Sequence, residues 1–134
     1  MKHIKEFRYG NRVIAVLVKR EFQKVGKHAN FISDPNSSLQ LGVGLYPKSH
    51  IADAHTHDWR EGHRVGYEEL LHLVRGRMRV NLYGNGKVKF TSFIMRGGDT
   101  VHFTSGGHSF EMLTPCKCIE VKQGPYEKEN KRFL

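Results

Sequence analysis

Short apolar or alternating segments, separated by glycine-containing turns, run through nearly the whole chain, and this pattern constrains the fold most. Each segment has the length of a β-strand, and none has a convincing amphipathic helical pattern. We expect strands within the ranges 12–19, 39–46, 51–57, 69–74, 78–83, 88–95, 100–103, 108–113 and 118–122. Short strands at such close spacing predict one all-β domain, built as a barrel or a double-sheet jelly roll.

The turn sequences add more specific predictions. Arg75-Gly76-Arg77 is expected to close a hairpin between the strands on either side. Tyr83-Gly84-Asn85-Gly86 contains Asn-Gly, which supplies the positive φ angles that tight hairpins prefer. Arg96-Gly97-Gly98-Asp99 is expected to turn the chain, and Asp34-Pro35-Asn36-Ser37-Ser38 has the composition of a loop.

The length and the cysteines bear on how the domain is held together. A chain of 134 residues can bury a sufficient core without disulfides. Cys116 and Cys118 are separated by one residue, and adjacent positions on one strand rarely suit a disulfide, so we expect two reduced thiols. Structural zinc sites usually space their cysteines two to four residues apart, so this pair alone does not predict a zinc site.

The net charge of +9, from 22 Lys and Arg against 13 Asp and Glu, favours anionic partners or else a solvated basic surface. The positive residues are scattered and accompany no zinc-finger or RNA-binding pattern, so we expect a small anionic ligand rather than nucleic acid. The charged start of the sequence does not resemble a signal peptide, and no apolar stretch has membrane-spanning length. We therefore expect a cytoplasmic protein with no membrane partner.

Four side chains suggest a metal site. His55 and His57 lie two apart in an alternating segment, which would turn both imidazoles to one face. Glu69 opens an otherwise apolar strand face, where a carboxylate is costly to bury unless it is paired or bound to a cation. His108 follows a glycine-rich turn that would lie at the rim of a barrel. Three imidazoles and a carboxylate suit Fe(II), Mn(II), Ni(II), Zn(II) or Cu(II) and leave a position for water or substrate.

These residues resemble the two motifs of the cupin superfamily, G-x5-H-x-H-x3,4-E-x6-G and G-x5-P-x-G-x2-H-x3-N. Ser49 occupies the first glycine position, and Glu69 is followed by six residues and then Gly76, as the first motif requires. Gly98 opens the second motif, and His108 closes its metal-binding part. The motifs cover about residues 49–76 and 98–112. The resemblance implies a cupin-type jelly-roll β-barrel that holds one divalent transition metal on His55, His57, Glu69 and His108.

The sequence also departs from the motifs. Eleven residues separate His57 from Glu69, where the family usually has three or four. The insert, residues 58–68, carries Trp59, His63 and Tyr67 and would shape access to the metal. Glu68 is the alternative to Glu69, but only Glu69 keeps the spacing to Gly76. The second motif is one residue short, lacks its proline and has methionine near the asparagine position.

Three other histidines are not expected to bind the metal. His72 lies on the strand face opposite Glu69 and is expected to be packed or hydrogen-bonded. His50 is out of phase with His55, and His102 has a supporting role at most. The expected barrel lining comprises Leu71, Leu73, Met78, Val80, Leu82, Phe110 and Met112, whereas Arg77 and Arg79 should point outward.

The resemblance leaves two functional classes open. Residues 120–126 resemble the end of small bacterial cupins of largely unassigned activity, some of which belong to surface-polysaccharide or nucleotide-sugar pathways. This implies an isomerase, an epimerase or an Fe(II) dioxygenase, with His63, Tyr67 and Glu111 as acid–base candidates. The alternative is a non-catalytic cupin that binds or senses a small ligand. The family resemblance also implies a homodimer.

Overall fold

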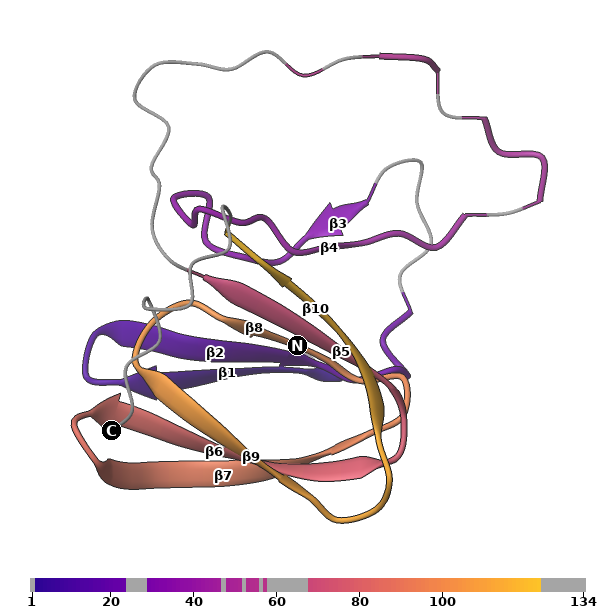
Figure 1. Ribbon diagram of the computed structural model, residues 1–134. Coiled ribbons are helices and arrows are strands. Elements are labelled where there is room, and N and C mark those ends of the chain that lie inside the picture. The colour runs from indigo at the N-terminus through magenta and orange to yellow at the C-terminus, as the bar shows by residue number, and fades with distance from the viewer. Residues whose placement is uncertain are drawn as a thin grey trace. The chain divides into compact units, whose positions relative to one another are not determined.

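The computed structural model describes residues 2–23, 29–46, 48–51, 53–55, 57 and 68–123. These residues form ten β-strands, all antiparallel in their pairings, and none of them is helical (Figure 1). The all-β prediction is therefore confirmed. The chain divides into a larger unit, residues 1–22 and 67–134, and a smaller unit, residues 23–66, which are described in turn.

The larger unit contains two sheets. The five-stranded sheet has the order β1-β2-β8-β5-β10 and the three-stranded sheet the order β7-β6-β9 (Figure 1). The strands of the first are β1 (Ile4–Tyr9), β2 (Arg12–Val18), β8 (Thr100–Phe103), β5 (Glu69–Arg75) and β10 (Lys117–Lys122). Those of the second are β7 (Val88–Arg96), β6 (Arg77–Asn85) and β9 (Gly107–Met112).

One apolar core joins the two sheets. Alternate residues of each strand point inward, which is the strand period of two, and burying each large aliphatic side chain contributes about 1.5–3 kcal/mol. The predicted lining is confirmed for Leu71, Leu73, Met78, Val80 and Leu82, all buried in this core, and Phe110 packs against it. The prediction that Met112 lines the core is wrong. It is 53% exposed, because it is the last residue of β9 at the edge of the three-stranded sheet.

The chain passes between the two sheets where a hairpin was expected. Arg75-Gly76-Arg77 connects β5 to β6, which lie in different sheets, so the predicted hairpin is wrong. The connections β7–β8 and β9–β10 also change sheet. All three run together, since Gly97 N donates to Gly76 O (3.1 Å) and Leu113 N donates to Arg77 O (2.9 Å). We call this place the sheet crossing.

Glycine is required at the sheet crossing. Gly76 has a φ of 105°, which L-residues with side chains rarely adopt. A Cβ at this position would also run into the carbonyl oxygen of Pro115 and the thiol of Cys116. The turn at Gly86 differs: it closes the predicted β6–β7 hairpin, with a φ of 64°, and a Cβ there would meet nothing.

A buried carboxylate organises the β7–β8 connection, and the predicted turn at residues 96–99 is confirmed. Asp99 is 2% exposed, and its Oδ2 lies 3.1 Å from the Lys19 ammonium and accepts from Arg96 N (2.9 Å). Its Oδ1 accepts from Arg20 N (3.1 Å). A buried charge of this kind is tolerated only when paired and hydrogen-bonded, so Asp99 ties the start of β8 to the end of β2.

The smaller unit contains little regular structure among its described residues. Its sheet pairs β3 (Asn30–Phe31) with β4 (Gly42–Val43), and the expected loop begins at Asp34, whose Oδ1 accepts from Asn36 N (2.7 Å). The strand predicted over 39–46 is confined to β4, because glycines in a strand offer no side chain to pack. The strand predicted over 51–57 is absent from its described residues.

Among the residues that the structure describes, no helix has the length and apolar character to cross a membrane.

Candidate metal site

Glu69 and His108 meet between the two sheets of the larger unit. Glu69 begins β5 in the five-stranded sheet, and His108 lies near the start of β9 in the three-stranded sheet. Oε2 of Glu69 is 3.0 Å from Nε2 of His108, and the side chains are 26% and 24% exposed. The structure thus brings together two of the four predicted metal ligands, at a place reached by solvent.

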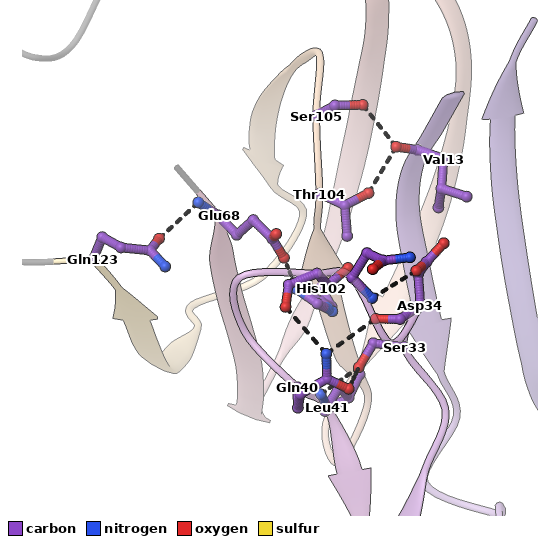
Figure 2. A network of polar contacts seen from close by, with 12 residues as sticks. Val13, Ser33, Asp34, Gln40, Leu41, Glu68, His102, Thr104, Ser105 and Gln123 are labelled. Carbon is purple, nitrogen blue, oxygen red and sulfur yellow. Dashed lines mark hydrogen bonds and ion pairs between the residues drawn. The ribbon is translucent and has the colours of Figure 1, made fainter. Parts of the chain in front are cut away.

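The turn before β9 is fixed to strand β2 and thereby positions His108. Thr104 Oγ1 and Ser105 Oγ both donate to the carbonyl oxygen of Val13, at 2.7 Å and 2.6 Å (Figure 2). Thr104 N donates to Ile14 O (2.9 Å). In β9, His108 is then paired with Leu82, whose buried side chain points into the core, so the imidazole also points inward.

The neighbouring carboxylate lies on the other face of the five-stranded sheet. Glu68 Oε1 lies 2.6 Å from Nε2 of His102, in a pair that is almost completely buried (Figure 2). Its backbone N donates to Oε1 of Gln123 (2.7 Å). In β8, Val101 and Phe103 point into the core, so His102 between them points outward. Glu68, the alternative ligand, is therefore engaged away from the Glu69–His108 pair.

The second ring nitrogen of His102 has an unusual environment. An ionised carboxylate only accepts hydrogen bonds, so the Nε2 that faces Glu68 carries a proton. The other nitrogen, Nδ1, is buried and has no hydrogen-bond partner among the described residues. The sequence predicts at most a supporting role for His102 and does not identify its partner. Its alternation with Val101 and Phe103 was the available signal that it faces away from the core.

His55 and His57 belong to the smaller unit, where both side chains are exposed. Their rings lie close, with centroids 4.9 Å apart and an interplanar angle of 82°. Nδ1 of His55 is 2.8 Å from the carbonyl oxygen of Asp53. A carbonyl can only accept, so Nδ1 carries a proton, and Nε2 is the nitrogen that remains for another partner. The two imidazoles are therefore neighbours, although the described residues of the predicted strand, 51, 53–55 and 57, are not in a strand.

Other candidate residues have different partners. Nδ1 of His72 is 2.8 Å from Thr100 Oγ1, which confirms a hydrogen-bonded role, and His50 stacks on Tyr46. Glu111 accepts from Arg79 (2.8 Å) in an exposed pair. The other two acid–base candidates, His63 and Tyr67, lie outside the described residues, as does Trp59 of the insert.

Cys116 and Cys118 are free thiols beside the sheet crossing. Cys116 Sγ donates to Thr114 O and Arg77 O, at 3.2 Å and 3.3 Å. Cys118 is exposed, but desolvation by neighbouring atoms, followed by the charges of Glu120 and Cys116, raises the pKa of its thiol above the ordinary value. A thiol with a raised pKa is a poor nucleophile and a poor metal ligand at neutral pH.

Within the described ranges, no group of three or more His, Cys, Asp or Glu side chains is arranged to hold a metal ion. Comparison with protein-family profiles, with curated proteins and with solved structures finds no significant match to this chain. The metal, the substrate, the homodimer and the cytoplasmic location therefore stay predictions.

Proposed function

We propose that this chain is a cupin-type protein that uses a divalent transition metal to bind or transform a small molecule. The observation that carries the proposal is the approach of Glu69 and His108 from two different sheets, 3.0 Å apart. Metal–ligand distances of about 2.0–2.2 Å put two donors of one ion about 3–3.5 Å apart, so this carboxylate and imidazole suit a shared ion. In the sequence motif, His55 and His57 supply the other donors.

The hydrogen bond of His55 supports a ligand role for this residue. Histidines that bind metals usually donate their second N–H to a carboxylate or a backbone carbonyl, which fixes the tautomer. The contact of Nδ1 with Asp53 O is of this type and leaves Nε2 as the metal donor. When bound, such an ion polarises a carbonyl or hydroxyl group or, as Fe(II), activates O2.

The backbone at the motif glycine positions also supports the cupin resemblance. Gly76 and Gly98 have φ angles of 105° and 98°, and Ser49, which replaces the first motif glycine, has a φ of 73°. A non-glycine residue at positive φ is uncommon, and serine costs about 1 kcal/mol or more there. Three positions that the motifs assign to glycine thus have the backbone conformation that favours glycine.

The strand order supports a jelly roll. β6 pairs with β7 and with β9 in one sheet, whereas β5 pairs with β8 and with β10 in the other. The segments β5–β6, β7–β8 and β9–β10 thus each change sheet at the sheet crossing, as in a ribbon of strands folded over into two layers. This arrangement brings the start of β5 and the start of β9 together, which is where Glu69 and His108 lie.

Elemental analysis of protein purified without added metal tests the proposal. We expect one transition metal ion per chain in the wild type, and loss of the ion in Glu69→Gln, in His108→Ala and in the double variant His55→Ala, His57→Ala. Glu111→Gln and His50→Ala are matched controls that remove a carboxylate and an imidazole elsewhere, and they should keep the metal. A wild type that binds none of the candidate metals would contradict the proposal.

The loaded protein then distinguishes the two functional classes. Turnover of a nucleotide sugar, or O2 consumption with a small-molecule panel, would identify an enzyme. A ligand-dependent rise in melting temperature without turnover would identify a binding or sensing protein instead.

A further inference from the structure

The ring of Phe103 lies beside both members of the Glu69–His108 pair. In the β5–β8 ladder, Phe103 is the direct partner of Glu69. Its ring stacks on the imidazole of His108, with centroids 4.0 Å apart and an interplanar angle of 18°. Phe103 is only 4% exposed and belongs to the core, so its own position is fixed by packing.

This stack restricts rotation of the His108 ring about χ2, which is the least constrained torsion of the side chain. Rotation of an imidazole about χ2 is broad, so a histidine held only by its backbone can point its ring nitrogens in several directions. A near-parallel aromatic ring covers one face of the imidazole and excludes most of those orientations. Phe110 also contacts His108, but its ring is tilted by 40° at a centroid distance of 5.3 Å and does not define the imidazole plane in the same way.

Strand β8 is held from both sides at this position. Phe103 pairs with Ala15 of β2 as well as with Glu69 of β5. On the opposite face, the preceding residue His102 contacts buried Glu68 at 2.6 Å. The ring of Phe103 is therefore a rigid surface, fixed relative to the strand that carries Glu69.

We propose that Phe103 is a positioning residue, which holds the imidazole of His108 with Nε2 aimed at the carboxylate of Glu69. The inference rests on the proposed metal-binding function and deepens it, because a pair of donors held in place loses less side-chain entropy when it binds an ion. Phe103 itself offers no donor atom to the ion.

Phe103→Leu tests the inference, with Phe93→Leu as the matched control. Phe93 is partly buried against the same core and stacks on Phe7, with centroids 4.7 Å apart and an interplanar angle of 19°, so the control also removes a stacked ring. Three properties are measured: stability in urea, the NMR shifts of the carbon-bound His108 ring protons in metal-free protein, and Zn2+ affinity by competition with a chelating dye. His108→Gln assigns the NMR signals.

We expect upfield-shifted His108 ring protons in the wild type, because they lie over the face of Phe103. Phe103→Leu should remove this shift and weaken Zn2+ binding about tenfold or more, the usual effect of losing a group that orients a metal ligand. Phe93→Leu should lose stability but keep both the shift and the affinity. Phe103→Met keeps most of the side-chain volume without a ring and replaces Phe103→Leu if that variant does not fold.

The outcomes separate this inference from the proposed function. If the wild type binds Zn2+ and Phe103→Leu binds it with the same affinity, the positioning role is overturned and the proposed metal site stands. Equal losses of affinity in Phe103→Leu and Phe93→Leu also overturn it, since a general loss of packing then explains both. No Zn2+ binding by the wild type overturns the proposed function together with the role of Phe103 in it.

Discussion

Glu68 and Glu69 are neighbours in the sequence, yet they contact histidines on opposite faces of one sheet. Glu68 meets His102 in a pair with side chains 7% and 0% exposed, whereas Glu69 meets His108 where both side chains are about one-quarter exposed. The first pair is enclosed by protein, and the second is reached by solvent. Two adjacent carboxylates thus have different physical roles.

Glu68→Gln should cost more stability than Glu69→Gln. The amide at position 68 replaces a charged acceptor for a buried imidazole, and the loss is expected to be about 1–3 kcal/mol. The side chains of the Glu69–His108 pair are about one-quarter exposed, so the same change there should cost less than about 1 kcal/mol. Urea unfolding of metal-free protein measures both values. The reverse order would show that the Glu68–His102 contact does not hold the sheet together.

Asp99→Asn should destabilise the protein by about 2–3 kcal/mol, because it removes the charge that pairs with Lys19 and accepts from Arg20 N and Arg96 N. Glu21→Gln is the control, since Glu21 forms an exposed 3.5 Å pair with Arg20 and should contribute almost nothing. Thermal unfolding measures both. Equal midpoints for the two variants would be inconsistent with a structural role for Asp99.

Gly76→Ala should be much more damaging than Gly86→Ala. Both glycines have positive φ, which costs an L-residue about 1–2 kcal/mol. Only at Gly76 does the new Cβ also meet backbone, at Pro115, so the total loss should exceed about 2 kcal/mol. Chemical denaturation of the two variants gives the comparison. A similar loss in both would mean that the sheet crossing can relax around the added methyl group.

Alkylation of Cys118 should be slow at neutral pH and should continue to accelerate above pH 9. Its pKa is raised by desolvation first and then by the nearby charges of Glu120 and Cys116, so less thiolate is present at a given pH than in a free cysteine. Iodoacetamide labelling of Cys116→Ser between about pH 7 and pH 10, followed by mass spectrometry, isolates this thiol. Replacing Glu120 by Gln in that background should lower the pKa and speed labelling; no change would exclude the carboxylate as a cause.

The sequence predicts most strands of the larger unit because their signals are local. β-branched and alternating residues mark β2, β5 and β8, and Asn85-Gly86 marks the β6–β7 hairpin. At Gly76 the local signal is incomplete. A glycine indicates a change of direction, but the sheet that the next strand joins depends on pairing with residues far along the chain. The predicted hairpin failed for that reason.

The sequence also predicts part of the candidate site. The spacing to Gly76 favours Glu69 over Glu68, and the structure then brings Glu69 within 3.0 Å of His108. The partner of Glu68 was not predicted, because His102 becomes its neighbour only through the register of β5 on β8. The segment with His55 and His57 alternates in sequence, but its described residues have no strand partner to stabilise an extended conformation.

The pairing of β2 with β8 has a consequence for how the chain folds. Val16 of β2 lies opposite His102 of β8, so most of the sequence separates these two paired strands. The β1–β2 hairpin, in contrast, forms between neighbouring segments of the chain. Distant pairings of this kind make folding slow. During synthesis the apolar strand β2 has no partner on its second edge until β8 has left the ribosome. We therefore expect this strand to be a target for chaperones, and to be the first segment to aggregate when synthesis is faster than folding.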